Sequence, residues 1–282
     1  MLRLGRYSYL PLYGPRKYKH PTIKDAWKSG PFLYLYIMTK FTPRSYCPQP
    51  LLPIKRVAIL VDGGFYKWRA HSLFGEKNPQ ERADELFSYC FAHTSQNKHY
   101  VSDIYRIFYY DCEPSSEIVY NPISKEHINL KQSPIYKWSS EFISLLKQKR
   151  KVALRLGKLT IHSPYSLSHN KIKQLCNGTI EWKEIGPHDL TLNLEQKGVD
   201  MRIGIDIASL AFKHQVDQIV LISGDSDFVP AAKLARREGI DFIVDSMGAK
   251  IADDLFEHID GLQTRIKKFL PKQTKICPSN QE

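Results

Sequence analysis

The stretch IVLISGDSDFVPAAKLARREGIDFIV, residues 219–244, decides the fold. It begins with four apolar residues, as in a strand that is buried on both faces of a parallel sheet. An acidic turn with Asp225 and Asp227 follows, then a helical pattern over 229–237 that Gly239 stops, and finally a second apolar strand. The order predicts a βαβ crossover with carboxylates at the carboxyl end of a strand, where open α/β sheets bind their ligands.

Further strands and helices alternate along the chain. The sequence predicts a strand over 55–62, helices over 65–73 and 79–97, a strand over 104–111, a helix over 139–149 that Ser139 or Ser140 caps, a strand over 152–161, a helix over 196–214 and a last helix over 253–261. Residues 113–134 show little pattern and predict a loop, lid or insertion, while 162–195 have no clear assignment. The alternation predicts an α/β fold, a three-layer α/β/α sandwich with a central, mostly parallel sheet.

The net charge of +12 lies at the two ends of the chain. Residues 1–50 contain nine Lys or Arg and one Asp, residues 265–282 contain five Lys or Arg and one Glu, and the residues between them are neutral overall. We therefore expect a basic, Tyr- and Pro-rich leader over 1–54 that is poorly ordered, one domain over 55–264 and a basic tail over 265–282. Basic ends can contact a polyanion such as nucleic acid, or they can be solvated tails without a role.

Cysteine usage and hydropathy indicate the compartment. The five cysteines are scattered and form no C-x-x-C pair, which argues against a disulfide framework or a structural zinc site and fits a reducing cytosol. No apolar run reaches the roughly 18 residues that a membrane helix needs. The sequence predicts a soluble, cytoplasmic protein with no membrane partner. Because the first regular element begins only near Lys55, Met38 is an alternative start of the native protein, which an intact mass would test.

Carboxylates stand at three places that this fold can bring together. Asp62 ends the first strand, Asp200 begins a helix, and Asp225 and Asp227 follow the strand of the opening stretch. Acids at the ends of parallel strands share one edge of the sheet. Asp206 lies about 120° around the helix from Asp200 and ranks second.

Carboxylates in this arrangement suit divalent cations. Such ions, roughly 4 Å apart when two are present, stabilise the charged oxygens of phosphodiester hydrolysis and activate water. Mg²⁺ prefers a few carboxylates together with waters and substrate oxygens. Each Asp alone could instead be a helix cap or a turn residue, above all Asp200 and Asp227. Asp62 and Asp225 together, at strand ends beside glycines, point to function.

Other chemistries fit the sequence less well. Gly63 and Gly64 follow a strand, but the chain has neither a G-x-G-x-x-G nor a P-loop pattern, and no G-x-S-x-G surrounds Ser223 or Ser226. Phosphatase-type phosphotransfer would need a D-x-D on the first strand, which is absent. Three of the ten histidines are expected at the surface or in packing: His71, His188 and His214.

Three blocks, VAILVDGG, QKGVDMRIGIDIASLA and IVLISGDSDFVPAAKLARREGIDFIVD, resemble the NYN domain of the PIN-like nuclease superfamily, in its LabA-like bacterial branch. The resemblance covers most of 55–262, although 66–195 are matched by the order of elements alone. It implies a PIN-like sandwich and a metal-dependent ribonuclease that uses Mg²⁺ or Mn²⁺.

The resemblance also implies roles for individual residues. It makes Asp62, Asp200 and Asp225 the metal ligands, and it adds Asp227 to the catalytic acids. Three further residues in matching motifs would support them. Asp206 would be a further acid, and Lys197 and Ser223 would contact phosphate or orient an acid.

Two functions of different classes follow. The first is an endoribonuclease that hydrolyses single-stranded RNA at the acidic site. The second is a non-catalytic RNA-binding or regulatory module, because Gly63-Gly64-Phe65 stands where many NYN proteins carry Asn shortly after the first Asp. The oligomeric state is open, and a homo-oligomer is one alternative.

Overall fold

A seven-stranded sheet forms the centre of the computed structural model, which describes residues 52–94, 99–161 and 165–270. The strands are, from one edge to the other, β11 (Gly261–Leu262), β10 (Asp241–Asp245), β9 (Gln218–Ile222), β1 (Ile54–Asp62), β2 (Val101–Cys112), β5 (Val152–Thr160) and β8 (Glu195–Lys197). All neighbouring pairs are parallel except β5 and β8, which are antiparallel. The predicted α/β class and mostly parallel sheet are confirmed.

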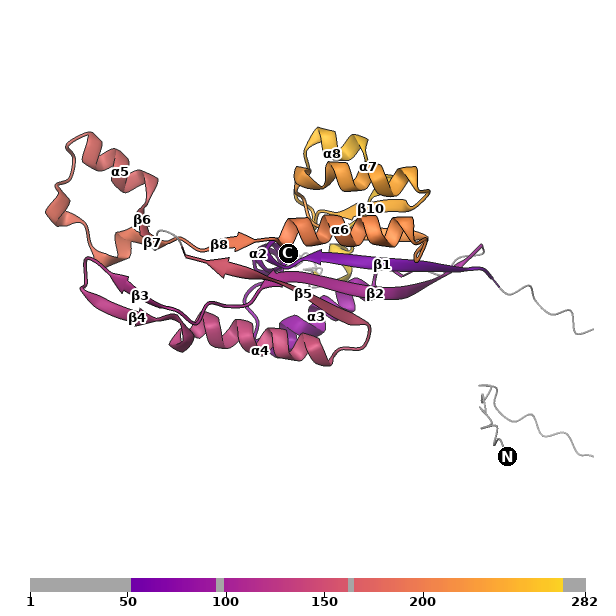
Figure 1. Cartoon of the computed structure of the whole chain (residues 1–282), viewed down its shortest axis with the longest axis horizontal. Helices are drawn as coiled ribbons and strands as arrows, with labels where there is room; N and C mark the ends of the chain where they lie inside the picture. Colours follow the sequence, from indigo (N-terminus) through magenta and orange to yellow (C-terminus); the bar gives the residue numbers. More distant parts are fainter. Residues whose placement is uncertain (1–51, 95–98, 162–164, 271–282) are drawn as a thin grey trace, which may run out of the picture. The chain divides into compact units, whose positions relative to one another are not determined.

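Helices cover both faces of this sheet (Figure 1). One face carries α2 (Gly63–Phe74), α3 (Pro79–Phe91) and α4 (Pro134–Gln148), and the other carries α6 (Val199–Phe212), α7 (Val229–Arg237) and α8 (Asp253–Glu257). β1 shows why two layers are needed, because its side chains alternate between two cores and are fully buried in both. Val57, Ile59 and Val61 face α2 and α3, whereas Ala58 and Leu60 face α6.

The opening stretch of the sequence folds as predicted. β9 is followed by a short 3-10 helix, η5 (Ser226–Phe228), then by α7, and the chain returns in β10 beside β9. The helix ends because Gly239 adopts a left-handed backbone, with φ of 78°, which costs glycine little. This βαβ unit brings the acidic turn to the carboxyl edge of the sheet.

The edge strand β8 approaches β5 closely at a glycine. A Cβ atom on Gly157 would lie 2.7 Å from the backbone oxygen of Lys197, so a larger residue there would push the strand away. Directly after β8, Gly198 adopts a left-handed backbone with φ of 79° and turns the chain into α6. The predicted helix over 196–214 therefore begins later, at Val199.

Residues 113–134, predicted as a loop or insertion, contain a β-hairpin. β3 (Ile118–Asn121) and β4 (Glu126–Asn129) pair antiparallel, and η2 (Leu130–Gln132) follows them. The prediction missed the hairpin because each strand has only four residues and β4 contains a single apolar one, Ile128.

Further predicted helix boundaries were wrong, and the last helix, predicted over 253–261, ends at Glu257 as α8. α4 begins at Pro134, not near residue 139, because Ser133 caps it by accepting the Tyr136 amide at 3.1 Å. α3 ends at Phe91 within the predicted 79–97, and residues 95–98 lie outside the described part. Its start is as expected, with Pro79 in the first turn and Asn78 as the cap.

The segment that the sequence left unassigned is made of short elements. They are β6 (Tyr165–Leu167), α5 (His169–Cys176), η3 (Trp182–Glu184), η4 (Pro187–Asp189) and β7 (Leu190–Leu192), and β6 pairs with β7. At the other end of the chain, η6 (Ile266–Lys268) packs buried Ile266 against the core between β1 and α3. The start of the predicted basic tail is thus part of the domain.

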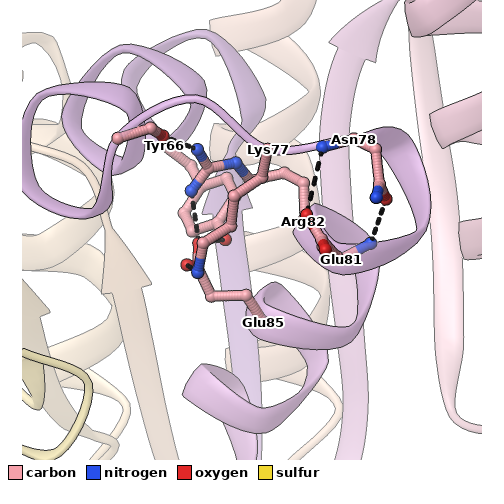
Figure 2. A network of polar contacts seen from close by, with 7 residues as sticks. Tyr66, Lys77, Asn78, Glu81, Arg82 and Glu85 are labelled. Carbon is pink, nitrogen blue, oxygen red and sulfur yellow. Dashed lines mark hydrogen bonds and ion pairs between the residues drawn. The ribbon is translucent and has the colours of Figure 1, made fainter. Parts of the chain in front are cut away.

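A buried ion network fixes α2 against α3 (Figure 2). The Arg82 guanidinium donates to Glu85 Oε1 and to the backbone oxygen of Gly75, each at 2.5 Å. Tyr66 donates to the same carboxylate at 2.9 Å, and Lys77 donates to its other oxygen at 2.6 Å. Because three side chains donate to this buried carboxylate, the network ties α2, which Asp62 caps, to α3.

Several expectations concern residues without a description. Most of the predicted leader over 1–54, Met38, Cys47 and Cys277 lie outside the described residues. Within the described ranges, Cys90, Cys112 and Cys176 are free thiols. None of the helices in those ranges has the length and apolar character that crossing a bilayer requires.

Candidate functional site

Four aspartates lie together at the carboxyl edge of the sheet. β1 and β9 are neighbours with Val61 level with Ile222, so Asp62 ends beside the start of the acidic turn. Asp225 and Asp227 stand in that turn, and Asp200 lies in the first turn of α6, which packs over the same strands. We call Asp62, Asp200, Asp225 and Asp227 the acidic cluster.

Ser223 connects two members of the acidic cluster. Its hydroxyl donates to Asp62 Oδ2 at 3.3 Å and accepts the backbone N–H of Asp225 at 3.4 Å. The side chain is buried, with 1 % of its surface exposed. The Ser223 hydroxyl is thus placed to orient the Asp62 carboxylate, and the role that the resemblance implies for it stays a prediction.

Two of the four aspartates also cap helices. Asp62 Oδ1 accepts the Phe65 amide at 3.1 Å at the start of α2, and Asp225 Oδ1 accepts the Asp227 amide at 3.0 Å at the start of η5. Within the described residues, the side chains of Asp200 and Asp227 accept no hydrogen bond. The capping role that the sequence favoured for Asp200 and Asp227 thus belongs to Asp62 and Asp225.

The acidic cluster is electrostatically strained. Burial raises the pKa of Asp62, with a further upward contribution from the charge of Asp200, while hydrogen bonds from Phe65 and Ser223 oppose the rise. The pKa of Asp200 is also raised, first by burial and then by the charges of Asp225 and Asp227. In the described ranges no Lys, Arg or His forms an ion pair with any of the four. Among these described residues, no cation offsets the repulsion between the four carboxylates.

The donor set fits a hard divalent cation. Carboxylate oxygens without an internal counter-charge are the ligands that Mg²⁺ and Mn²⁺ prefer. Across the described part of the chain, no group of three or more His, Cys, Asp or Glu is arranged closely enough to ligate an ion. The proposed triad of Asp62, Asp200 and Asp225 consequently stays a prediction.

Asp206 belongs to a different arrangement from the acidic cluster. Its Oδ2 accepts the Arg155 Nε–H at 2.9 Å and the Tyr110 hydroxyl at 2.8 Å, so it ties α6 to β2 and β5. Burial, and then the Asp206 charge, raise the pKa of Tyr110 well above its usual range. Asp206 therefore forms an ion pair with Arg155, whereas no member of the acidic cluster forms one among the described residues.

Lys197 lies on the exposed edge strand β8. Its Nζ is 3.6 Å from a carboxylate oxygen of Glu195, and both side chains are about half exposed. The three histidines that the sequence assigned to the surface or packing are exposed: His71, His188 and His214.

Two buried aspartates at the same edge were not predicted. Asp111 at the end of β2 accepts the Tyr109 hydroxyl at 2.7 Å and pairs with Lys67 Nζ at 2.8 Å. Asp245 at the end of β10 accepts the Tyr89 hydroxyl at 2.6 Å and lies 3.0 Å from His93 Nε2. Both follow apolar strands as Asp62 does, so the strand-end signal was available in the sequence.

Comparison with known proteins supports the family resemblance for part of the chain. Residues 164–262, about one third of the sequence, match the family model of the NYN domain. NYN domains are part of the PIN-like nuclease superfamily, whose members typically use divalent metals. The match contains Asp200, Asp225 and Asp227, whereas Asp62 lies outside it.

The structural comparison is weaker. A crystal structure of a protein of unknown function from Vibrio parahaemolyticus aligns with a TM-score of 0.39 and 15% identity, covering 74% of this chain and 91% of that chain. No curated protein matches the chain.

Proposed function

We propose that this protein is a metal-dependent endoribonuclease that hydrolyses RNA phosphodiesters at the acidic cluster. The observation that carries the proposal is the gathering of four aspartates at the carboxyl edge of the sheet, where burial first, and then the charges of neighbouring aspartates, raise the pKa of Asp62 and Asp200. Like charges brought together without an internal counter-ion are costly unless a cation binds there. The NYN match over 164–262 supports nuclease chemistry for the same residues.

Each residue has a distinct task in this proposal. Asp62, Asp200 and Asp225 would hold Mg²⁺ or Mn²⁺, and the ion when bound would neutralise phosphodiester charge and activate water. Ser223 keeps the Asp62 carboxylate in place through its hydroxyl. Asp227, whose side chain accepts no hydrogen bond among the described residues, is available to accept a proton from the attacking water. Lys197 on the neighbouring edge strand would contact a substrate phosphate.

The proposed substrate is single-stranded RNA, met in the cytoplasm. An open acidic edge accommodates an extended strand, and the basic ends of the sequence would add attraction for phosphates. Assignment to the LabA-like branch is part of the same proposal.

The test is cleavage of a fluorescent single-stranded RNA by purified protein with Mn²⁺. We expect D225N to lose roughly 100-fold or more of the rate, because it removes a ligand charge. D217N is the matched control, since Asp217 is an exposed aspartate just before the other end of β9. Equal cleavage by D225N and the wild type would refute the site.

A second candidate is a non-catalytic RNA-binding or regulatory module. Asp62 and Asp225 cap α2 and η5, which would preserve both aspartates in a protein that does not cut. This reading predicts RNA binding that is equal in D225N and in the wild type, without any change of melting temperature on adding Mg²⁺ or Mn²⁺. A metal-dependent rise in melting temperature that D225N abolishes would exclude it.

A further inference from the structure

A concave feature lies beside the acidic cluster. A cavity of about 280 Å³ lies between the end of β2, the first turn of α4 and the residues leading into β8. Its walls are mainly apolar, and Leu130, Leu159, Leu192 and Leu194 contribute to them. The volume is near the lower end of ligand cavities, roughly 300–1,000 Å³. It suits a single base or nucleoside and not a folded macromolecule.

Unused polar groups converge on this apolar cavity. Tyr136 and Ser139 line it from α4, and Gln196 lines it from β8. Within the described residues, the Tyr136 hydroxyl, the Ser139 hydroxyl and the Gln196 amide form no hydrogen bond. Apolar walls with a few free donors and acceptors are the usual composition of a small-molecule site.

The cavity carries little net charge at its deep end. Asp111 is buried there, but Lys67 Nζ lies 2.8 Å from its carboxylate and Tyr109 donates to it at 2.7 Å. A paired and hydrogen-bonded carboxylate neither attracts a cation nor strongly repels a neutral ligand. The occupant should therefore be neutral, planar or compact, and able to form hydrogen bonds.

Gln196 joins the cavity to the acidic cluster. A Cβ atom on Gly64 would lie 3.5 Å from Asp62 Oδ1 and 3.9 Å from the Gln196 side-chain amide. The same glutamine lines the cavity. A strand with a phosphate at Asp62 would thus have its neighbouring nucleotide at the cavity mouth.

We infer that this cavity binds one RNA base next to the scissile phosphate and sets the base preference of cleavage. The inference rests on the proposed function and deepens it. The leucines would cover the base, while Tyr136, Ser139 and Gln196 would read its edge, as proteins read unstacked RNA bases. Lys67 and Asp111 would close the deep end.

Binding is tested without catalysis, by titrating each of the four ribonucleoside monophosphates into D225N in EDTA and measuring heat. We expect one monophosphate to bind best, and S139A and Q196A, each in the D225N background, to weaken it by about 10-fold. S144A is the matched control, because Ser144 is exposed elsewhere on α4. No binding of any monophosphate, or equal binding by all these variants, would overturn the inference.

Cleavage provides the second test. RNAs that differ at one nucleotide beside the cut should show a preferred base, and S139A and Q196A should bring the kcat/KM ratio of preferred to other bases about 10-fold closer to one. RNA with an abasic nucleotide at that position should be cut equally by the wild type and S139A. If cleavage keeps its base preference in both S139A and Q196A, the proposed base site is refuted and the proposed nuclease activity stands. If a monophosphate binds but no RNA is cut, the proposed nuclease activity is refuted and the proposed base site stands.

Discussion

Aspartates at the carboxyl edge of this sheet fall into two groups, one on each face. On the face that carries α2 and α3, Asp111 and Asp245 are buried, with 3 % and 0 % of their surfaces exposed. Lys67 and Tyr109 compensate the first, and Tyr89, His93 and the Met247 amide surround the second. On the face that carries α6, the acidic cluster is more exposed and has no cation of its own among the described residues.

The difference separates acids whose charge is compensated within the fold from acids for which we propose a metal ligand. A buried carboxylate with full hydrogen bonding stabilises the native state only together with its partners. A cluster of like charges without a counter-charge costs stability, and groups perturbed in this way gather at functional sites. Three substitutions test this contrast, from the largest expected effect to the smallest.

D245A should lower the free energy of unfolding by about 3–5 kcal/mol. The substitution leaves the Tyr89 hydroxyl and the His93 ring buried without their acceptor. Urea denaturation followed by circular dichroism measures the change, with D253A, at an exposed aspartate in the first turn of α8, as a control that should cost about 1 kcal/mol or less.

If D245A is too unstable to purify, D245N keeps one acceptor oxygen and should cost less. A loss below about 1 kcal/mol in D245A would show that this aspartate is not needed by the fold, and the contrast between the faces would fail.

G63A should cost about 1–3 kcal/mol. Gly63 is the first residue of α2. It lies in the chain between Asp62, which belongs to the acidic cluster, and Lys67, which pairs with Asp111 on the other face of the sheet. An added Cβ would meet the Tyr109 ring and the Tyr110 backbone oxygen, each at 2.6 Å. G64A is the neighbouring control, since its Cβ would have ordinary contacts from 3.5 Å. Thermal melts in EDTA compare the two, and equal melting temperatures would show that the turn tolerates a side chain.

D200N should stabilise the metal-free protein at neutral pH by about 0.2–1 kcal/mol, the scale of exposed ion pairs. The pKa of Asp200 is raised by burial and by Asp225 and Asp227, so its ionised form is less favourable in the folded than in the unfolded state. The penalty begins as pH rises through the ordinary value of 3.8 and is complete above the raised folded-state pKa. The gain should therefore disappear as pH falls below 3.8.

Melts of D200N and the wild type across this pH range, in EDTA, measure that difference. Mn²⁺ should reverse the order, because the wild type then gains a ligand that D200N has weakened. A destabilised D200N at neutral pH without metal would mean that Asp200 already has a partner.

The regular elements with long apolar patterns were predictable from local sequence. The helix over 229–237 matches α7 at both ends, since Gly239 and the apolar strands on either side define it locally. The hairpin over Ile118–Asn129 was missed because its strands are short and mostly exposed. α4 begins at Pro134, five residues before the predicted start at Ser139, because the capping serine is Ser133 and not Ser139.

The site residues show the same division between what local sequence predicts and what depends on packing between distant segments. Strand ends, a helix start and the SGDSD turn led the sequence to predict Asp62, Asp200, Asp225 and Asp227 as site residues, and their role stays a prediction. Asp206 has the same residue type and lies in the same helix as Asp200, yet Arg155 and Tyr110 occupy its carboxylate. That pairing joins residues far apart in the chain, so no local pattern could reveal it.

The sequence alone determined the longer strands and helices of the central sandwich and predicted that acids gather at one edge, because periodicity and strand ends are local properties. Only the tertiary structure decided which acids are neutralised. The face that each side chain occupies, and the lysine, tyrosine or serine that meets it there, depend on packing between distant segments. For that reason Asp111 and Asp245 belong to the core, while Asp62 and Asp225 stand at the candidate site.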